Sequence, residues 1–168
     1  MGILSQNCNA IKDRQDSLAV LSICRKMYDR MASQIFNTGG LVIGSGSKKA
    51  VKLANTIYGI AGGVPFTKTT AEATLAAVTI TNAKFNVCCV YVDKDGTFST
   101  KFGKEGAALV NVIFPVATEG AAMLGYVILN PTGTGNFVGA TTDLDDGTVV
   151  PNAVYVNTVG PCDPSATI

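Results

Sequence analysis

Apolar residues near the start of the chain recur at steps of three and four, the spacing that lines one face of an α-helix. The residues at these steps are Leu21, Cys24, Tyr28, Met31 and Ile35. Neither glycine nor proline occurs between residues 9 and 36, and Asn37-Thr38-Gly39-Gly40 follows. We therefore expect an amphipathic helix over residues 9–36, ended by a glycine in the left-handed conformation of a C-cap.

From Leu41 onward the pattern changes to short runs rich in β-branched and aromatic residues, separated by Gly, Asn, Asp and Pro. Such runs are typical of strands joined by tight turns. The clearest hairpins are "KFNVCCVYVD" with "TFSTKF", and "AVKLANTIYGIAGG" with "VPFTKTT", where Gly62-Gly63 forms the turn. We predict a mainly β protein, with a β-sandwich over residues 39–160, a helical segment over 1–38 before it and an extended tail over 161–168 after it.

The apolar face of the expected helix has two interpretations. It can pack on the β domain of its own chain, as a single amphipathic helix commonly does. It can instead join copies of the chain, or a neighbouring subunit, through a coiled-coil seam. The two-part layout favours the seam, because a helix outside a domain has to bury its apolar face elsewhere. We predict a homo-oligomer, with a trimer favoured, held through Leu21, Cys24, Tyr28, Met31 and Ile35.

Composition agrees with a subunit of an assembly. Charged residues make up 15% of the chain and the mean hydropathy is +0.30, whereas soluble domains average roughly 25% charged residues. The net charge is +1 without a long basic run, which argues against nucleic acid as a partner. No apolar run reaches the roughly 20 residues of a membrane span. The start "MGILSQNCNAIKDRQD" shows no secretory signal, so we expect no membrane partner and synthesis in a cytoplasm.

The residue types needed for common catalytic and metal sites are scarce. The chain has 5 cysteines and no histidine, so histidine-based nucleophile activation is excluded and a zinc site is not expected. Cys88 and Cys89 are adjacent in an expected strand and should face opposite sides of a sheet as small buried residues. We predict no catalytic residue, no cofactor and no metal ligand.

Two acidic runs invite a calcium interpretation. In "TTDLDDGTV" the acidic residues Asp143, Asp145 and Asp146 do not alternate as calcium ligands do, and no glutamate follows. We expect a polar turn whose side chains accept hydrogen bonds from the backbone. The run Asp93-Lys94-Asp95-Gly96 receives the same interpretation, as a hairpin turn.

The stretch "GLVIGSGSKKA" looks like a phosphate-binding loop. A Walker loop places Lys directly after its last Gly and then Ser or Thr, but here Ser47 follows Gly46 and Lys49 follows Lys48. A dinucleotide loop needs a third glycine and a helix, and "AVKLANTIY" alternates like a strand. We therefore expect Gly44 to Ser47 to be a turn between helix and β domain, with exposed lysines after it.

The β half resembles a domain of tailed-bacteriophage virion proteins. The resemblance is carried by "GSGS", by "NTIY", by the Asp-Gly hairpin and by "GYVILNPTGTGNFVGATTDL", with Ala140 where that pattern has glycine. It covers the chain from Thr38 onward and leaves out the helix.

This resemblance implies a structural virion component, such as a capsid decoration or head-fibre protein, located in the virion and without catalytic residues. Its expected partners are its own copies and the major capsid protein or other virion proteins. The alternative is a receptor- or glycan-binding tail module that uses the loops at Pro131 to Asn136 and Asp143 to Gly147. A content of 7% aromatic residues and no Trp weakens that alternative, because sugars stack on aromatic rings.

Overall fold

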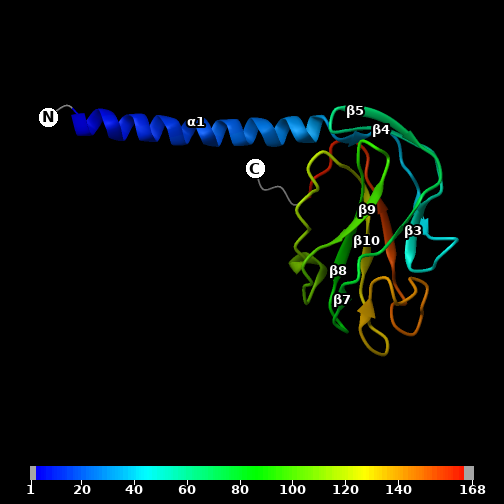
Figure 1. Ribbon diagram of the computed structural model, residues 1–168. Coiled ribbons are helices and arrows are strands. Elements are labelled where there is room, and N and C mark those ends of the chain that lie inside the picture. Colours follow the sequence, from blue (N-terminus) through cyan, green and yellow to red (C-terminus); the bar gives the residue numbers. More distant parts are fainter. Residues whose placement is uncertain (1–2, 165–168) are drawn as a thin grey trace.

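The computed structural model describes residues 3–164, and the side chains of residues 14–164. It is mainly β, with a long N-terminal helix that projects from one end of a β body (Figure 1), and this confirms the expected fold class. The helix α1 spans Ile3–Met31, and the short 3₁₀ turn η1 spans Leu109–Asn111. The strands are β1 (Gln34–Ile35), β2 (Leu41–Ile43), β3 (Ala50–Leu53), β4 (Ile57–Ala61), β5 (Val64–Lys68), β6 (Glu72–Thr74), β7 (Thr79–Ile80), β8 (Asn86–Val92), β9 (Phe98–Phe102), β10 (Ala122–Leu129), β11 (Phe137–Val138) and β12 (Val154–Asn157).

The central element of the body is a four-stranded antiparallel sheet in the order β12-β10-β8-β9. Smaller antiparallel sheets, β1-β4-β5, β2-β3-β6 and β11-β7, pack on one of its faces in a sandwich-like arrangement. The main core lies between them and includes Val90 and Leu124 of the central sheet, Leu53 and Ile57 of the smaller sheets, and Phe137. Side chains alternate along each strand, so every second residue of a strand points into this core.

The opposite face of the central sheet is covered by the segment 103–121, which crosses it without forming a strand. Phe114 from this segment packs edge-to-face on Tyr126, with ring centroids 5.2 Å apart, and joins a second cluster with Cys89 and Tyr91. Cys88 belongs to the main core instead, so the two adjacent cysteines face opposite sides as predicted. Because both faces are covered, β8 is buried at every position.

Both predicted hairpin turns are present, but the run predicted as the first strand of the second hairpin is divided into β3 and β4, which belong to different sheets. Strands β8 and β9 pair from Val92 with Phe98, and the Asp93 carboxylate accepts hydrogen bonds from the backbone N–H groups of Asp95 and Thr97 in the turn. Strands β4 and β5 pair from Ala61 with Val64, and the intervening Gly62 and Gly63 have φ values of +56° and +81°. Two successive positive φ angles match the twist of the flanking strands and favour glycine at both positions.

The helix differs from its prediction at both ends. It begins at Ile3 rather than near residue 9 and ends at Met31 rather than at residue 36. Ile35, predicted on the helix, lies in β1, pairs with Gly59 of β4 and is 1% exposed. The body therefore begins shortly after Met31, and Gly39 and Gly40 are not the helix cap. Within residues 3–164, α1 lacks the continuous apolar stretch that a membrane-spanning helix needs.

Candidate assembly interface

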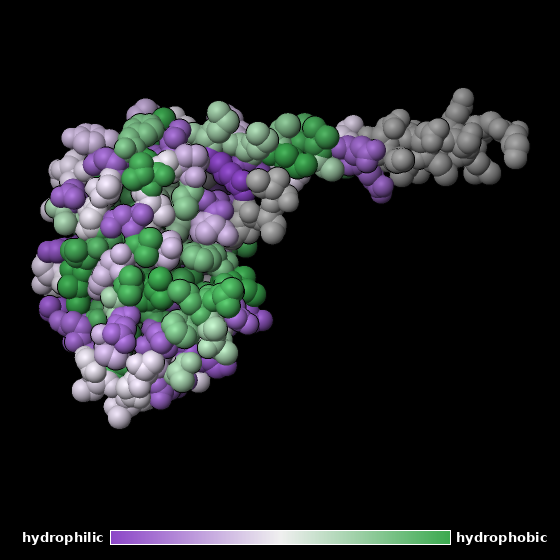
Figure 2. Space-filling view, turned by 180° about the vertical axis from the view of Figure 1, so that it is seen from behind, coloured by the Kyte–Doolittle hydropathy of each residue, from purple (hydrophilic) through white to green (hydrophobic). Residues whose placement is uncertain are grey.

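The C-terminal half of α1 has one apolar side and one polar side. At about 100° per residue, the exposed Leu18 falls on the polar side, whereas the apolar residues from Val20 to Met31 fall within an arc of about 160°. We call them the apolar stripe: Val20, Leu21, Ile23, Cys24, Met27, Tyr28 and Met31. All of them are exposed, with Leu21, Tyr28 and Met31 at 64%, 66% and 67%. Figure 2 shows hydrophobic side chains along the helix where it leaves the body.

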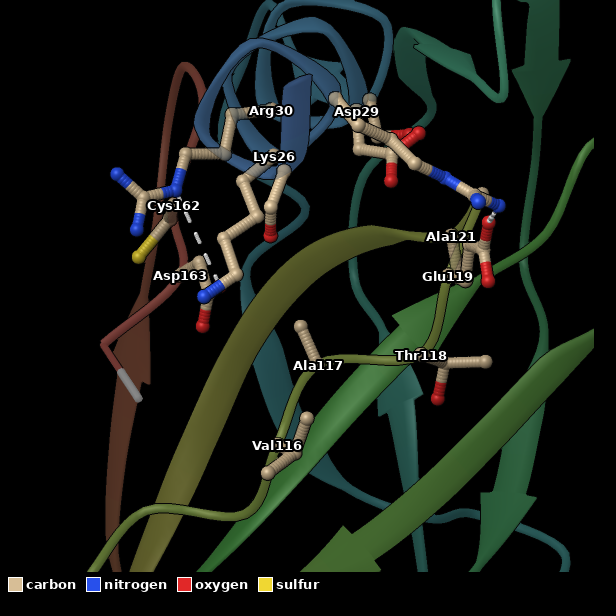
Figure 3. A pocket seen from close by; sticks show the side chains of 14 residues that line it. Lys26, Asp29, Arg30, Val116, Ala117, Thr118, Glu119, Ala121, Cys162 and Asp163 are labelled. Carbon is tan, nitrogen blue, oxygen red and sulfur yellow. Dashed lines mark hydrogen bonds and ion pairs between the residues drawn. The ribbon is translucent and has the colours of Figure 1, made fainter. Parts of the chain in front are cut away.

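The polar side of the same helix segment faces the β body. A cavity of about 470 Å³ lies between α1, the segment 116–121 and the residues Cys162 and Asp163, and on the helix it is lined by Ser22, Arg25, Lys26, Asp29 and Arg30. Figure 3 shows the side chains of Lys26 and Arg30 close to Asp163 on the body. The apolar stripe lies on the other side of the helix and is therefore directed away from the body.

Two ion pairs join the polar side to the body. The Arg25 guanidinium donates a hydrogen bond to the Glu119 carboxylate, and this bond together with the charge of Glu119 raises the pKa of Arg25. Arg30 Nε lies 4.0 Å from Asp163 Oδ2. The Arg25–Glu119 pair is mostly solvent-exposed, so it contributes to the direction of the helix more than to the stability of the fold.

The end of α1 is fixed by the β4–β5 turn. The Gly63 N–H donates to the Ala32 carbonyl at 2.8 Å, and the Gly62 N–H donates to Ser33 Oγ at 3.0 Å. Carbonyl groups at a helix end lack partners within the helix, and here the turn supplies them. Ala32 and Ser33 are buried. The helix is therefore held at a defined position on the body, with its apolar stripe outward.

The structure separates the residues predicted for assembly. Leu21, Cys24, Tyr28 and Met31 lie together on the apolar stripe, which also contains Val20, Ile23 and Met27. Ile35 does not belong with them. It is a core residue of β1, and its backbone pairs with Gly160 as well as with Gly59. The predicted intramolecular use of the stripe, packing on the β domain of the same chain, does not occur for the side chains of residues 14–31.

The loop that resembled a phosphate site binds a carboxylate of its own chain. The turn at Gly44 to Ser47 joins β2 to β3, rather than the helix to the body. Glu72 Oε1 accepts hydrogen bonds from Ser45 N–H (2.7 Å), from Ser45 Oγ (2.9 Å) and from Gly46 N–H (2.9 Å). These bonds lower the pKa of Glu72 to about 2. The loop therefore has the geometry of an anion-binding site, but the anion that it binds is the Glu72 carboxylate of the same chain.

The lysines after this loop differ in exposure. Lys48 is exposed and forms an ion pair with Asp145 at 3.0 Å, whereas Lys49 is half-buried. In the same acidic run, Asp146 Oδ1 accepts hydrogen bonds from the Thr148 N–H and hydroxyl at 2.9 and 2.6 Å. This confirms the predicted polar turn. The loops of residues 131–136 and 143–147 lie at the end of the body opposite the helix (Figure 1).

Among the described side chains, no group of three or more His, Cys, Asp or Glu is placed to hold a metal ion. Burial raises the pKa of the Cys89 thiol to about 12 and also raises that of Cys88. Such thiols stay protonated and unreactive near neutral pH. Cys24 is different, because it is exposed on the apolar stripe.

Comparison with known proteins gave no match: no family model fits the chain, and neither the curated proteins nor the solved structures contain a significant relative. The arguments about function therefore rest on the residues and contacts above.

Proposed function

We propose that this protein is a non-enzymatic structural subunit that forms a homo-oligomer, a trimer, through the apolar stripe of α1. The observation that carries the proposal is the orientation of the helix: its polar side meets its own body, and its apolar stripe faces outward. An exposed apolar surface of this kind is typical of interaction sites. A second copy of the same helix offers an apolar surface of matching length and spacing.

The width of the stripe supports more than two helices in the assembly. Leu21, Cys24, Tyr28 and Met31 have the alternating three- and four-residue spacing of a coiled-coil seam. Val20 and Met27 add a neighbouring row, so the apolar arc is wider than the narrow seam of a two-stranded coil. In a trimer each helix contacts two others, and a wide stripe is buried on both sides. The bodies then lie on the outside of the bundle, since each is attached to the polar side.

We place this assembly in a bacteriophage virion, as a capsid decoration or head-fibre protein whose partners are its own copies and the major capsid protein. The support is the resemblance of residues 38 onward to β domains of tailed-phage virion proteins, together with the low charge of the chain. In this arrangement the helix bundle attaches and the β bodies project. The loops of residues 131–136 and 143–147, at the far end from the helix, would be outermost.

The oligomer is tested with a pair of variants at adjacent positions. Leu21→Asp places a carboxylate on the apolar stripe, whereas Ser22→Asp places it on the polar side of the same turn. Burying an unpaired charge between helices is strongly unfavourable. Light scattering should give about three times the chain mass of 17.4 kDa for the natural sequence and for Ser22→Asp, and the monomer mass for Leu21→Asp. Equal masses for all three proteins would contradict the proposal.

The virion role is tested by binding. The full-length protein should bind empty capsid shells of the phage that encodes it and should give no specific signal on a glycan array. Specific glycan binding without binding to shells would instead favour the receptor-binding tail module.

A further inference from the structure

A second exposed apolar surface lies on the small sheet β1-β4-β5. In this sheet Gln34 pairs with Ile60 and Ile60 with Pro65, so these side chains share one face. Two residues further along, the Phe36 N–H donates to the Tyr58 carbonyl at 2.9 Å, and the Phe36 and Tyr58 side chains share the face of Gln34 and Ile60. Phe36 and Tyr58 are 54% and 51% exposed. We call Phe36, Tyr58, Ile60 and Pro65 the outer sheet face.

The other face of this sheet packs on the main core of the body. Ile35, Ile57 and Ala61 point inward and are buried in the main core. Neighbouring residues along a strand point to opposite faces, so Phe36, Tyr58 and Ile60 must point outward. The same face also carries Gln34 and Thr67 and no charged side chain. Two identical faces that carry charges of one sign would repel each other. Because this face carries no charge, two copies of it can meet without such repulsion.

The outer sheet face continues the apolar stripe. The Gly63 N–H binds the Ala32 carbonyl directly after the helix, and a side-chain carbon added at Gly63 would lie 3.7 Å from the Tyr28 hydroxyl oxygen. Figure 1 shows β4 and β5 at the top of the body, level with the end of α1, whereas the polar side of α1 lines the cavity that it shares with the segment 116–121. The stripe and the outer sheet face are therefore on the same side of the molecule.

We propose that the outer sheet face is a second contact surface between copies of this chain. The inference rests on the proposed self-assembly through α1. Packed helices lie about 8–10 Å apart, and the sheet begins directly beyond the helix end. Copies that pack through Tyr28 and Met31 therefore bring their outer sheet faces together. The helix bundle alone would join the subunits through their helices, and contact between Phe36 and Tyr58 of neighbouring copies fixes how the β bodies are arranged around it.

The test compares Tyr58→Lys with Val154→Lys in the full-length protein. The two side chains are 51% and 50% exposed and both lie on strands, but Val154 is on β12 of the central sheet. Sedimentation equilibrium should show the dissociation constant of the oligomer raised by about tenfold or more for Tyr58→Lys, and unchanged for Val154→Lys. Equal dissociation constants for the two variants, in an oligomer that Leu21→Asp still dissociates, would overturn the inference and leave the proposed function standing.

Hydroxyl-radical footprinting supplies a second measurement that does not depend on the folding of a Tyr58 variant. Tyr58 should be oxidised several-fold more slowly in the natural oligomer than in the monomeric Leu21→Asp protein, while Val154 should react equally in both. Equal oxidation of Tyr58 in the two proteins would overturn the inference. A natural sequence that is monomeric at all concentrations would overturn the proposed function and this inference with it.

Discussion

Helix α1 and the β body differ in where their apolar residues lie. In the body, strands such as β8 are buried at every position, although Phe36 and Tyr58 of the outer sheet face are exposed. In α1 the polar residues face the molecule and the apolar stripe faces solvent. The body thus has a buried core of its own, whereas no described side chain covers the apolar stripe. In the proposed assembly, the body folds around its own core and the apolar stripe is covered by other copies of the chain.

The boundary between the two regions gives the largest expected effect. Deletion of residues 1–30 removes the helix and should leave a folded monomer. Deletion of residues 1–36 also removes β1 and with it Ile35, whose loss from the core costs about 2–5 kcal/mol. Urea unfolding followed by circular dichroism should show the longer deletion destabilised by at least that amount. If both deletions give proteins of equal stability, then Ile35 does not belong to the core.

The Gly62-Gly63 turn of the body holds the end of the helix by hydrogen bonds, and the conformation of the turn should require glycine. Gly63 has φ +81°, where an L-residue is strained by about 1–2 kcal/mol. Gly63→Ala should destabilise the monomeric Leu21→Asp protein by about that amount in thermal or urea unfolding. Gly147→Ala is the matched control, because no neighbouring atom lies within 4 Å of an added carbon there. Equal effects at the two positions would show that the turn does not require glycine.

A smaller effect belongs to the loop of the body that binds Glu72. Hydrogen bonds from Gly46 and Ser45 lower the pKa of Glu72 from its ordinary value of 4.5 to about 2, so the contact stabilises the loop fully above about pH 4.5 and is lost as the pH falls toward 2. NMR titration of the Glu72 carboxyl carbon should give a midpoint of about 2, and the amide signals of Ser45 and Gly46 should move with it. A midpoint near 4.5 would mean that the loop does not hold the carboxylate.

Local patterns were sufficient to predict several features of the structure. The helix, the hairpins at Gly62-Gly63 and at Asp93 to Gly96, and the opposite faces of Cys88 and Cys89 all depend on neighbours in the sequence. The end of the helix was not predictable in this way. Ile35 continues the three- and four-residue spacing of the stripe, and no glycine occurs between Gly2 and Gly39. Its place in β1 is decided by pairing with Gly59 and by the turn that binds Ala32 and Ser33.

The contacts that define the candidate interface are more distant still. The pairing of Arg25 with Glu119 spans 94 positions, and the bond from Gly62 to Ser33 spans 29. Periodicity indicates that a helix has an apolar side, but it does not show which side meets the body. That information comes from the fixed end of α1 at Gly62 and Gly63.

The central claim, that the apolar stripe joins copies of the chain, is tested most directly by cross-linking at Cys24. In a Cys8→Ser, Cys162→Ser background, Cys24 is exposed on the stripe and the other thiols, Cys88 and Cys89, are buried. Mild oxidation of the full-length protein should give a disulfide-linked dimer band. The same band should be absent when Cys24→Ser is combined with Ser22→Cys, which moves the thiol to the polar side. Equal cross-linking from both positions, or none from Cys24 at concentrations where the oligomer is present, would contradict the claim.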